Sequence, residues 1–268
     1  MFAEELRLIF RRPRNIVILT LLGLVPALLG FLVKYFGGHG GNGGQGPPFF
    51  QQLTQNSLFL SLVGLVTIET FLLPMAVAFV SGDSIAGEAQ SGALRYLLVA
   101  PISRTRLALT KMAASIVFGF VASFVVMGSG WLFGLLLFPH GAVVTLSGTV
   151  ISEGHAFILS VQAALAVGIA MVSVVAISTY ASTYTESPIA AVAIGLGVAI
   201  VSEILDPIPQ LQAIATLLPS HYWQAFIDLF RTPTNYSQLI KEVISQLSWL
   251  LVGVVGSLLN FRSKDILT

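Results

Sequence analysis

The sequence predicts an all-α integral membrane protein with six transmembrane helices. Hydrophobic residues make up 55% of the chain and charged residues only 9%, whereas soluble domains carry about 25% charged residues. Six apolar segments reach or approach the roughly 20 residues that a membrane span needs. The absence of cysteine excludes disulfides and thiolate metal sites. A net charge of +1 without a long basic block gives no indication of nucleic-acid binding.

The N-terminal residues 1–14 are predicted to form a short amphipathic helix. Phe2, Leu6, Ile9 and Phe10 fall on one face and charged residues on the others, a pattern typical of helices that lie in the membrane interface. Pro13 then ends or bends this helix before the first span. The alternative is a frayed tail that supplies only positive charge.

The six predicted spans follow in order, and two of them have unusual lengths. The third is overlong, so it tilts or projects beyond the bilayer, and the fifth is short and contains glycine. The segments are Ile16–Tyr35, Leu58–Val80, Leu107–Phe138, Phe157–Tyr180, Pro188–Leu205 and Val243–Phe261.

The placement of lysine and arginine predicts the orientation. If the N-terminus is cytoplasmic, all but three of the 13 Lys and Arg residues lie on the cytoplasmic side. The three on the outer side are Lys34, Arg231 and Lys241. An even number of spans then places both termini in the cytoplasm.

The longest outer loop is predicted between the last two spans, at residues 206–246. Its apolar residues have helical spacing punctuated by proline, and Tyr222 and Trp223 suit the membrane interface. We expect short helices there that partly re-enter the outer leaflet. The inner connection at 181–187 is very short. The four histidines lie in three separate outer loops without ligand-type spacing, so no metal site is expected.

No catalytic motif is present. The phosphate-binding pattern GxxxxGK[ST] is absent, as are HExxH and GxSxG. The chain is therefore expected to be a non-enzymatic protein.

Glu69 is the most unusual residue of the second span. It lies near the middle of an apolar segment, where an ionised carboxylate is costly and generally faces a cavity or a partner. Either it lines a translocation path or binds a proton, or it is hydrogen-bonded and only fixes the packing. Both interpretations remain open at this stage.

The segment 81–111 is the strongest functional signal. It connects two spans and carries charges of both signs together with the apolar side chains Leu94, Tyr96, Leu97 and Leu98. Ser84–Gln90 can form a helix, Gly92 interrupts it, and a second amphipathic piece precedes Pro101. The alternative is an ordinary positively charged connector.

This segment resembles the signature of the permeases of the ABC-2 class of ABC transporters. An acidic pair, a glycine and leucine, a proline followed by an arginine, and a lysine soon after stand at the matching positions; they are Asp83, Glu88, Gly92, Leu94, Pro101, Arg104 and Lys111. Ala93 departs from the usual threonine. The C-terminal stretch FRSKDIL also resembles an ending common in that family.

The resemblance implies the transmembrane subunit of an ABC exporter in the cell membrane. Two ATPase subunits on separate chains would bind ATP and Mg²⁺, so no cofactor is expected on this chain, and a second permease, identical or related, would complete the complex among membrane lipids. Residues 1–14 would be the interfacial elbow, and residues 81–106 the region that couples to the ATPase. The coupling residues would be Asp83, Glu88, Arg95, Leu97, Leu98, Pro101 and Arg104.

Two alternatives to this function remain. The chain could be a membrane scaffold or assembly factor that transports nothing, or a proton-coupled secondary transporter that uses Glu69. The exported substrate would be a lipid, a drug or another amphipathic molecule, and the sequence does not distinguish among them.

Overall fold

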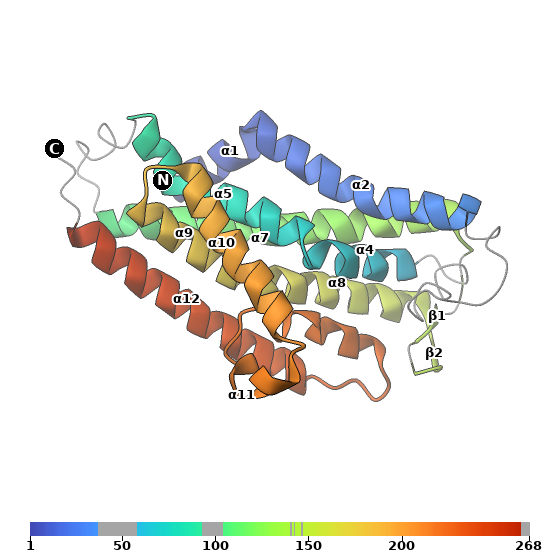
Figure 1. Ribbon diagram of the computed structural model, residues 1–268. Coiled ribbons are helices and arrows are strands. Elements are labelled where there is room, and N and C mark those ends of the chain that lie inside the picture. The colour runs from blue at the N-terminus through green and yellow to red at the C-terminus, as the bar shows by residue number, and fades with distance from the viewer. Residues whose placement is uncertain (37–57, 93–103, 140, 142, 146, 264–268) are drawn as a thin grey trace.

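The protein is a bundle of long helices, as its composition predicts (Figure 1). The computed structural model describes residues 1–36, 58–92 and 104–263, except 140, 142 and 146. Within these ranges five helices or helix pairs are long and apolar enough to cross a membrane, and a bent pair makes the sixth. The predicted fold class, an all-α membrane protein, is thus confirmed.

The main helices are α1 (Phe2–Arg11), α2 (Pro13–Phe36), α4 (Phe59–Glu69), α5 (Leu72–Gln90), α7 (Arg104–Leu137), α8 (Glu153–Ala170), α9 (Val172–Tyr184), α10 (Pro188–Leu205) and α12 (Ser237–Ser263).

The second span is broken rather than continuous. Helices α4 and α5 meet at an angle of 57°, with Thr70 and Phe71 between them. Pro74 lies in the first turn of α5, and a proline there cannot donate to the carbonyl of Thr70 and clashes with it. The predicted single helix Leu58–Val80 is therefore two helices, and the second continues beyond the predicted limit to Gln90.

The last span begins earlier than predicted. Helix α12 starts at Ser237, so the outer loop ends at Tyr236 and not at Gln246. The side chain of Gln246 is buried and hydrogen-bonded to two backbone groups: its amide donates to the carbonyl of Pro219 over 2.9 Å, and its oxygen accepts from the N–H of Ser173 over 3.0 Å. Tertiary contacts of this kind stabilise the polar early turns of α12 that hydropathy alone assigns to a loop.

The loop between α10 and α12 contains the expected short helices. They are η1 (Pro209–Leu211), α11 (Gln212–Ala215) and η2 (Trp223–Phe230). Helix η2 packs on α8 and α12 and contributes Trp223 and Phe226 to the core, both fully buried. A small hairpin, β1 (Val143–Val144) paired antiparallel with β2 (Val150–Ile151), lies between α7 and α8 and does not change the fold class.

Both described ends of the chain lie at the same end of the bundle (Figure 1). Helix α1, the end of α5, the start of α7 and the C-terminal end of α12 all lie toward that end (Figure 1), and we call this region the α1 end. The connection between α9 and α10 is only Thr185–Ser187 and lies at the same end (Figure 1). This arrangement agrees with an even number of spans.

Candidate functional site

Two of the residues predicted to couple the chain to an ATPase, Asp83 and Glu88, lie at the α1 end. Asp83 and Glu88 lie in the last turns of α5, and Arg104 is the first residue of α7. Arg95, Leu97, Leu98 and Pro101 fall outside the described residues, as does the side chain of Arg104. The geometry of the site therefore rests on Asp83 and Glu88 and on what surrounds them.

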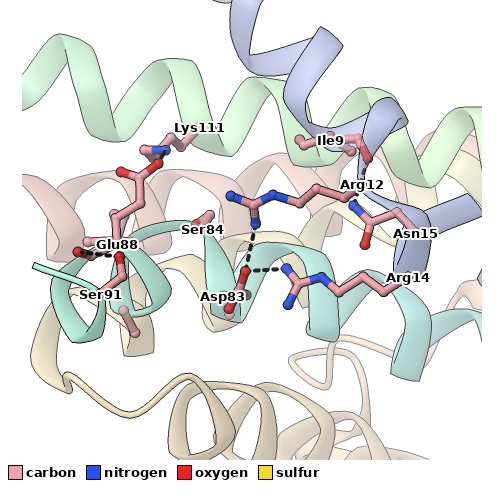
Figure 2. A network of polar contacts seen from close by, with 12 residues as sticks. Ile9, Arg12, Arg14, Asn15, Asp83, Ser84, Glu88, Ser91 and Lys111 are labelled. Carbon is pink, nitrogen blue, oxygen red and sulfur yellow. Dashed lines mark hydrogen bonds and ion pairs between the residues drawn. The ribbon is translucent and has the colours of Figure 1, made fainter. Parts of the chain in front are cut away.

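Asp83 binds two arginines from the junction between α1 and α2 (Figure 2). Arg12 Nη1 donates to Asp83 Oδ2 over 2.8 Å, and Arg14 Nη2 donates to the same oxygen. Arg12 has an extended backbone because Pro13 disfavours the helical conformation in the residue before it. The elbow formed in this way brings both guanidinium groups to α5.

Lys111 joins three helices. Its Nζ donates to Glu5 Oε1 of α1 over 3.0 Å and to Glu88 Oε1 of α5 over 2.5 Å, while Lys111 itself belongs to α7. The lysine side chain is only 2% exposed. A buried ammonium is tolerated only when it is paired and hydrogen-bonded, so these two carboxylates are what keep Lys111 in this position.

Apolar contacts fix α1 in the same place. Ile9 is buried in the main core, and the ring of Phe10 lies 6.0 Å from the ring of Phe118 in α7. Asn15 Nδ2 also donates to the carbonyl of Ile9 over 2.8 Å, across the elbow. Leu8, on another face, is exposed, and Phe2 is exposed at the start of the helix. Helix α1 is thus amphipathic as predicted, and one of its faces is docked onto the bundle.

A serine of α9 holds the end of α5 from the other side. Ser182 Oγ donates to the carbonyl of Gly82 over 2.7 Å and accepts from the N–H of Ala86 over 2.8 Å. Gly82 is itself packed against α10, where an added Cβ would lie 2.9 Å from the backbone nitrogen of Val192. The end of α5 is therefore held by polar contacts to α1, α7 and α9 and by close packing on α10.

Sequence reasoning identified Asp83, Glu88 and Lys111 but neither the bond between Glu88 and Lys111 nor the partners supplied by Glu5, Arg12 and Arg14. Arg12 and Asp83 are 71 residues apart, and Ser182 and Gly82 are 100 residues apart. No periodicity or motif spacing connects residues at such separations. The only available signal was that these opposite charges lie in segments predicted to be on the same side of the membrane.

The family of ABC-2 family transporter proteins matches this chain over residues 2–259. No curated protein matches it. The family match covers nearly all of the chain. It includes the ion pairs at the α1 end, which we call the acid–base network and which join Glu5, Arg12, Arg14, Asp83, Glu88 and Lys111.

The chain belongs to the ABC-2 transporter family. It is therefore a multi-pass membrane protein and a permease component of an ABC transporter. Members of this family are generally non-catalytic transmembrane subunits that work with ABC ATPase subunits. The acid–base network described above is thus part of an ABC-2 permease chain.

A second polar feature of this ABC-2 chain lies inside the bundle. Glu69, the last residue of α4, is 1% exposed, and neither of its carboxyl oxygens has a hydrogen-bond partner among the described residues. Glu242 of α12 is equally buried and equally unpartnered among the described residues. Sequence analysis had placed Glu242 in the outer loop. Buried carboxyl groups of this kind can bind a proton, and ionisable side chains within transmembrane helices are rare outside functional positions.

The described histidines form no metal centre. His221 contacts Asp206 and packs edge-on against Tyr222. The backbone N–H of His155 donates to the side chain of Ser152, the N-cap of α8. Within the described ranges no three His, Asp or Glu side chains converge in an arrangement that could hold a metal ion.

Proposed function

We propose that this chain is the transmembrane subunit of an ABC exporter that moves an amphipathic substrate, such as a lipid or a drug, outward across the cell membrane. Two ATPase subunits on separate chains bind ATP and Mg²⁺, and a second permease chain, identical or related, completes the complex. The α1 end faces the cytoplasm in this proposal. The positive-inside rule supports that orientation, because Arg7, Arg11, Arg12, Arg14 and Lys111 all lie at the α1 end of the described structure.

The observation that carries the proposal is the connection of α1, α5 and α7 through Lys111. Residues 93–103 join the end of α5 to the start of α7. Glu88 near the end of α5 and Lys111 near the start of α7 are bonded directly to each other. A force applied to the joining segment therefore reaches α5 and α7 together, and α1 moves with them through Glu5.

This geometry divides the predicted coupling residues into two groups. Asp83 and Glu88 bond to residues of their own chain, so we assign them to holding the coupling segment in position. Arg95, Leu97, Leu98, Pro101 and Arg104 remain for contact with the ATPase. Leucine side chains surrounded by charges provide the packed centre and polar rim that stable interfaces require.

The experiment that tests the function is purification of the native complex from membranes through a tag on this chain. We expect an ATPase subunit in a one-to-one ratio with the permease, ATP turnover by the complex, and loss of turnover when the phosphate-loop lysine of the ATPase is replaced. A chain that purifies without any ATPase, and whose membranes show no ATP-dependent export, would contradict the proposal.

A second candidate function is favoured by Glu69. Its carboxyl group is buried, unpartnered and located at the break between α4 and α5, a suitable place for a proton to control a helix movement. A proton-coupled secondary transporter would take up or extrude substrate in response to a pH gradient without ATP. Transport by vesicles that contain only this chain, with and without a pH gradient, separates the two candidates.

A further inference from the structure

Three hollows lie next to one another along the face formed by α10 and α12. Their volumes are about 400, 410 and 350 Å³. Trp249 lines all three, Val252 lines the first and the last, and Ile194 and Val198 line the second and third. Because they share these side chains, the hollows form a continuous depression on the surface, which we call the Trp249 groove.

The end of the groove nearest the start of α12 is polar and positively charged. Lys241 lines it together with the hydroxyl-bearing side chains of Thr216, Tyr222 and Ser245. Lys241 is exposed and forms no ion pair with any described residue, whereas the neighbouring cation Arg231 lies 3.4 Å from Asp228. An ammonium group without an ion pair, in a hollow that hydroxyl-bearing side chains also line, is suited to a phosphate.

The rest of the groove is apolar and has the length of one membrane leaflet. From Lys241 to Gly253 the axis of α12 rises by about 18 Å, at about 1.5 Å per residue. This is close to half of the roughly 30 Å hydrocarbon core of a bilayer. Trp249 forms the floor in a fixed position, because its indole N–H donates to the carbonyl of Leu217 over 3.2 Å.

We propose that the Trp249 groove binds an anionic phospholipid of the leaflet at the Lys241 end. The phosphate contacts Lys241, and one acyl chain lies along Trp249 and Val252 toward Ile177 and Tyr180. Charge complementarity and the match to one leaflet select this occupant over an uncharged lipid. The site goes beyond the proposed function, because binding requires neither transport nor an ATPase.

The test uses quenching of tryptophan fluorescence by brominated phospholipids, with the full-length chain in nanodiscs. The chain has three tryptophans. Trp223 is fully buried, and Trp131 of α7 is not among the residues that line the groove and lies against Phe157. The Trp131→Phe variant therefore reports mainly on Trp249, and a Trp249→Phe variant reports on the ordinary lipid shell at Trp131.

We expect brominated anionic lipid to quench Trp249 at about a fivefold lower mole fraction than brominated zwitterionic lipid. One lysine near an anionic headgroup gains about 1 kcal/mol of attraction, and this free energy corresponds to a factor of about five in binding. Lys241→Gln abolishes the difference. Lys34→Gln, which removes another exposed lysine at the end of α2, retains it, and Trp131 shows no preference between the two lipids.

Three outcomes would overturn the proposal. Equal quenching of Trp249 by both lipids would show that the groove holds only ordinary shell lipid. Protection of Trp249 from both lipids would show that protein, such as a second copy of the chain, covers the groove. A preference that survives Lys241→Gln would place the anion elsewhere.

Discussion

Replacing Lys111 with methionine should destabilise the protein more than any other single change in the acid–base network. Methionine keeps the approximate length of the side chain but leaves Glu5 and Glu88 without their cation, and both carboxylate side chains are only 14% exposed. Removing one partner of a buried ion pair costs about 3–5 kcal/mol. Because the carboxylates retain some contact with solvent, we expect the lower value, about 3 kcal/mol.

Asp83→Asn provides the matched comparison at the same end of the bundle. Its partners Arg12 and Arg14 are 39% and 50% exposed, and ion pairs exposed to this degree contribute at most about 1 kcal/mol. The two variants should therefore differ by about 2 kcal/mol, a factor of roughly 30 in the unfolding constant.

Equilibrium unfolding in mixed micelles with increasing SDS measures both losses. The double variant Lys111→Met with Glu88→Met should recover part of the stability of the single Lys111→Met variant, because one of the buried charges left without a partner is removed as well. Equal losses for Lys111→Met and Asp83→Asn would refute the reasoning, since burial would then not decide the strength of these ion pairs.

Two further predictions concern orientation and Glu69. Because the chain has no native cysteine, single cysteines can be labelled without background: Thr234→Cys should react with an impermeant thiol reagent on intact cells, and Ser91→Cys only after permeabilisation. The opposite pattern would invert the proposed orientation. Glu69→Gln removes a charge while keeping the shape, so it should leave assembly intact and alter the pH dependence of transport if Glu69 carries a proton. A rate and pH profile equal to those of the wild type would leave Glu69 a packing residue.

The sequence was sufficient to predict the spans because long apolar runs specify them directly. Helix α10 has the predicted bounds, and α2 and α7 differ from prediction only at their ends. The break before α5 follows from Pro74 by a local rule and could have been expected. The early start of α12 could not, because Gln246 becomes compatible with the bundle only through its bonds to Ser173 and Pro219.

The candidate site was predictable in part for a similar reason. Charges of both signs between two spans marked Asp83 and Glu88 as unusual, and the family resemblance gave them a role. Their actual partners are set by the way α1 folds back over α5 and α7. That arrangement depends on packing between segments far apart in the chain, and no local pattern encodes it.

The most direct test of the account is the effect of the coupling segment on the ATPase. In a variant that combines Arg95→Glu, Leu97→Ala and Leu98→Ala, each lost contact should cost about 1–3 kcal/mol if these residues are the centre of the interface. The acid–base network is untouched, so the chain should remain folded in the membrane. ATPase co-purification, ATP turnover and substrate export should be measured on the same preparations. We predict that the variant releases the ATPase, or that its ATPase hydrolyses ATP without substrate export. Wild-type levels of binding, turnover and export would contradict the claim that this segment couples ATP hydrolysis to the permease.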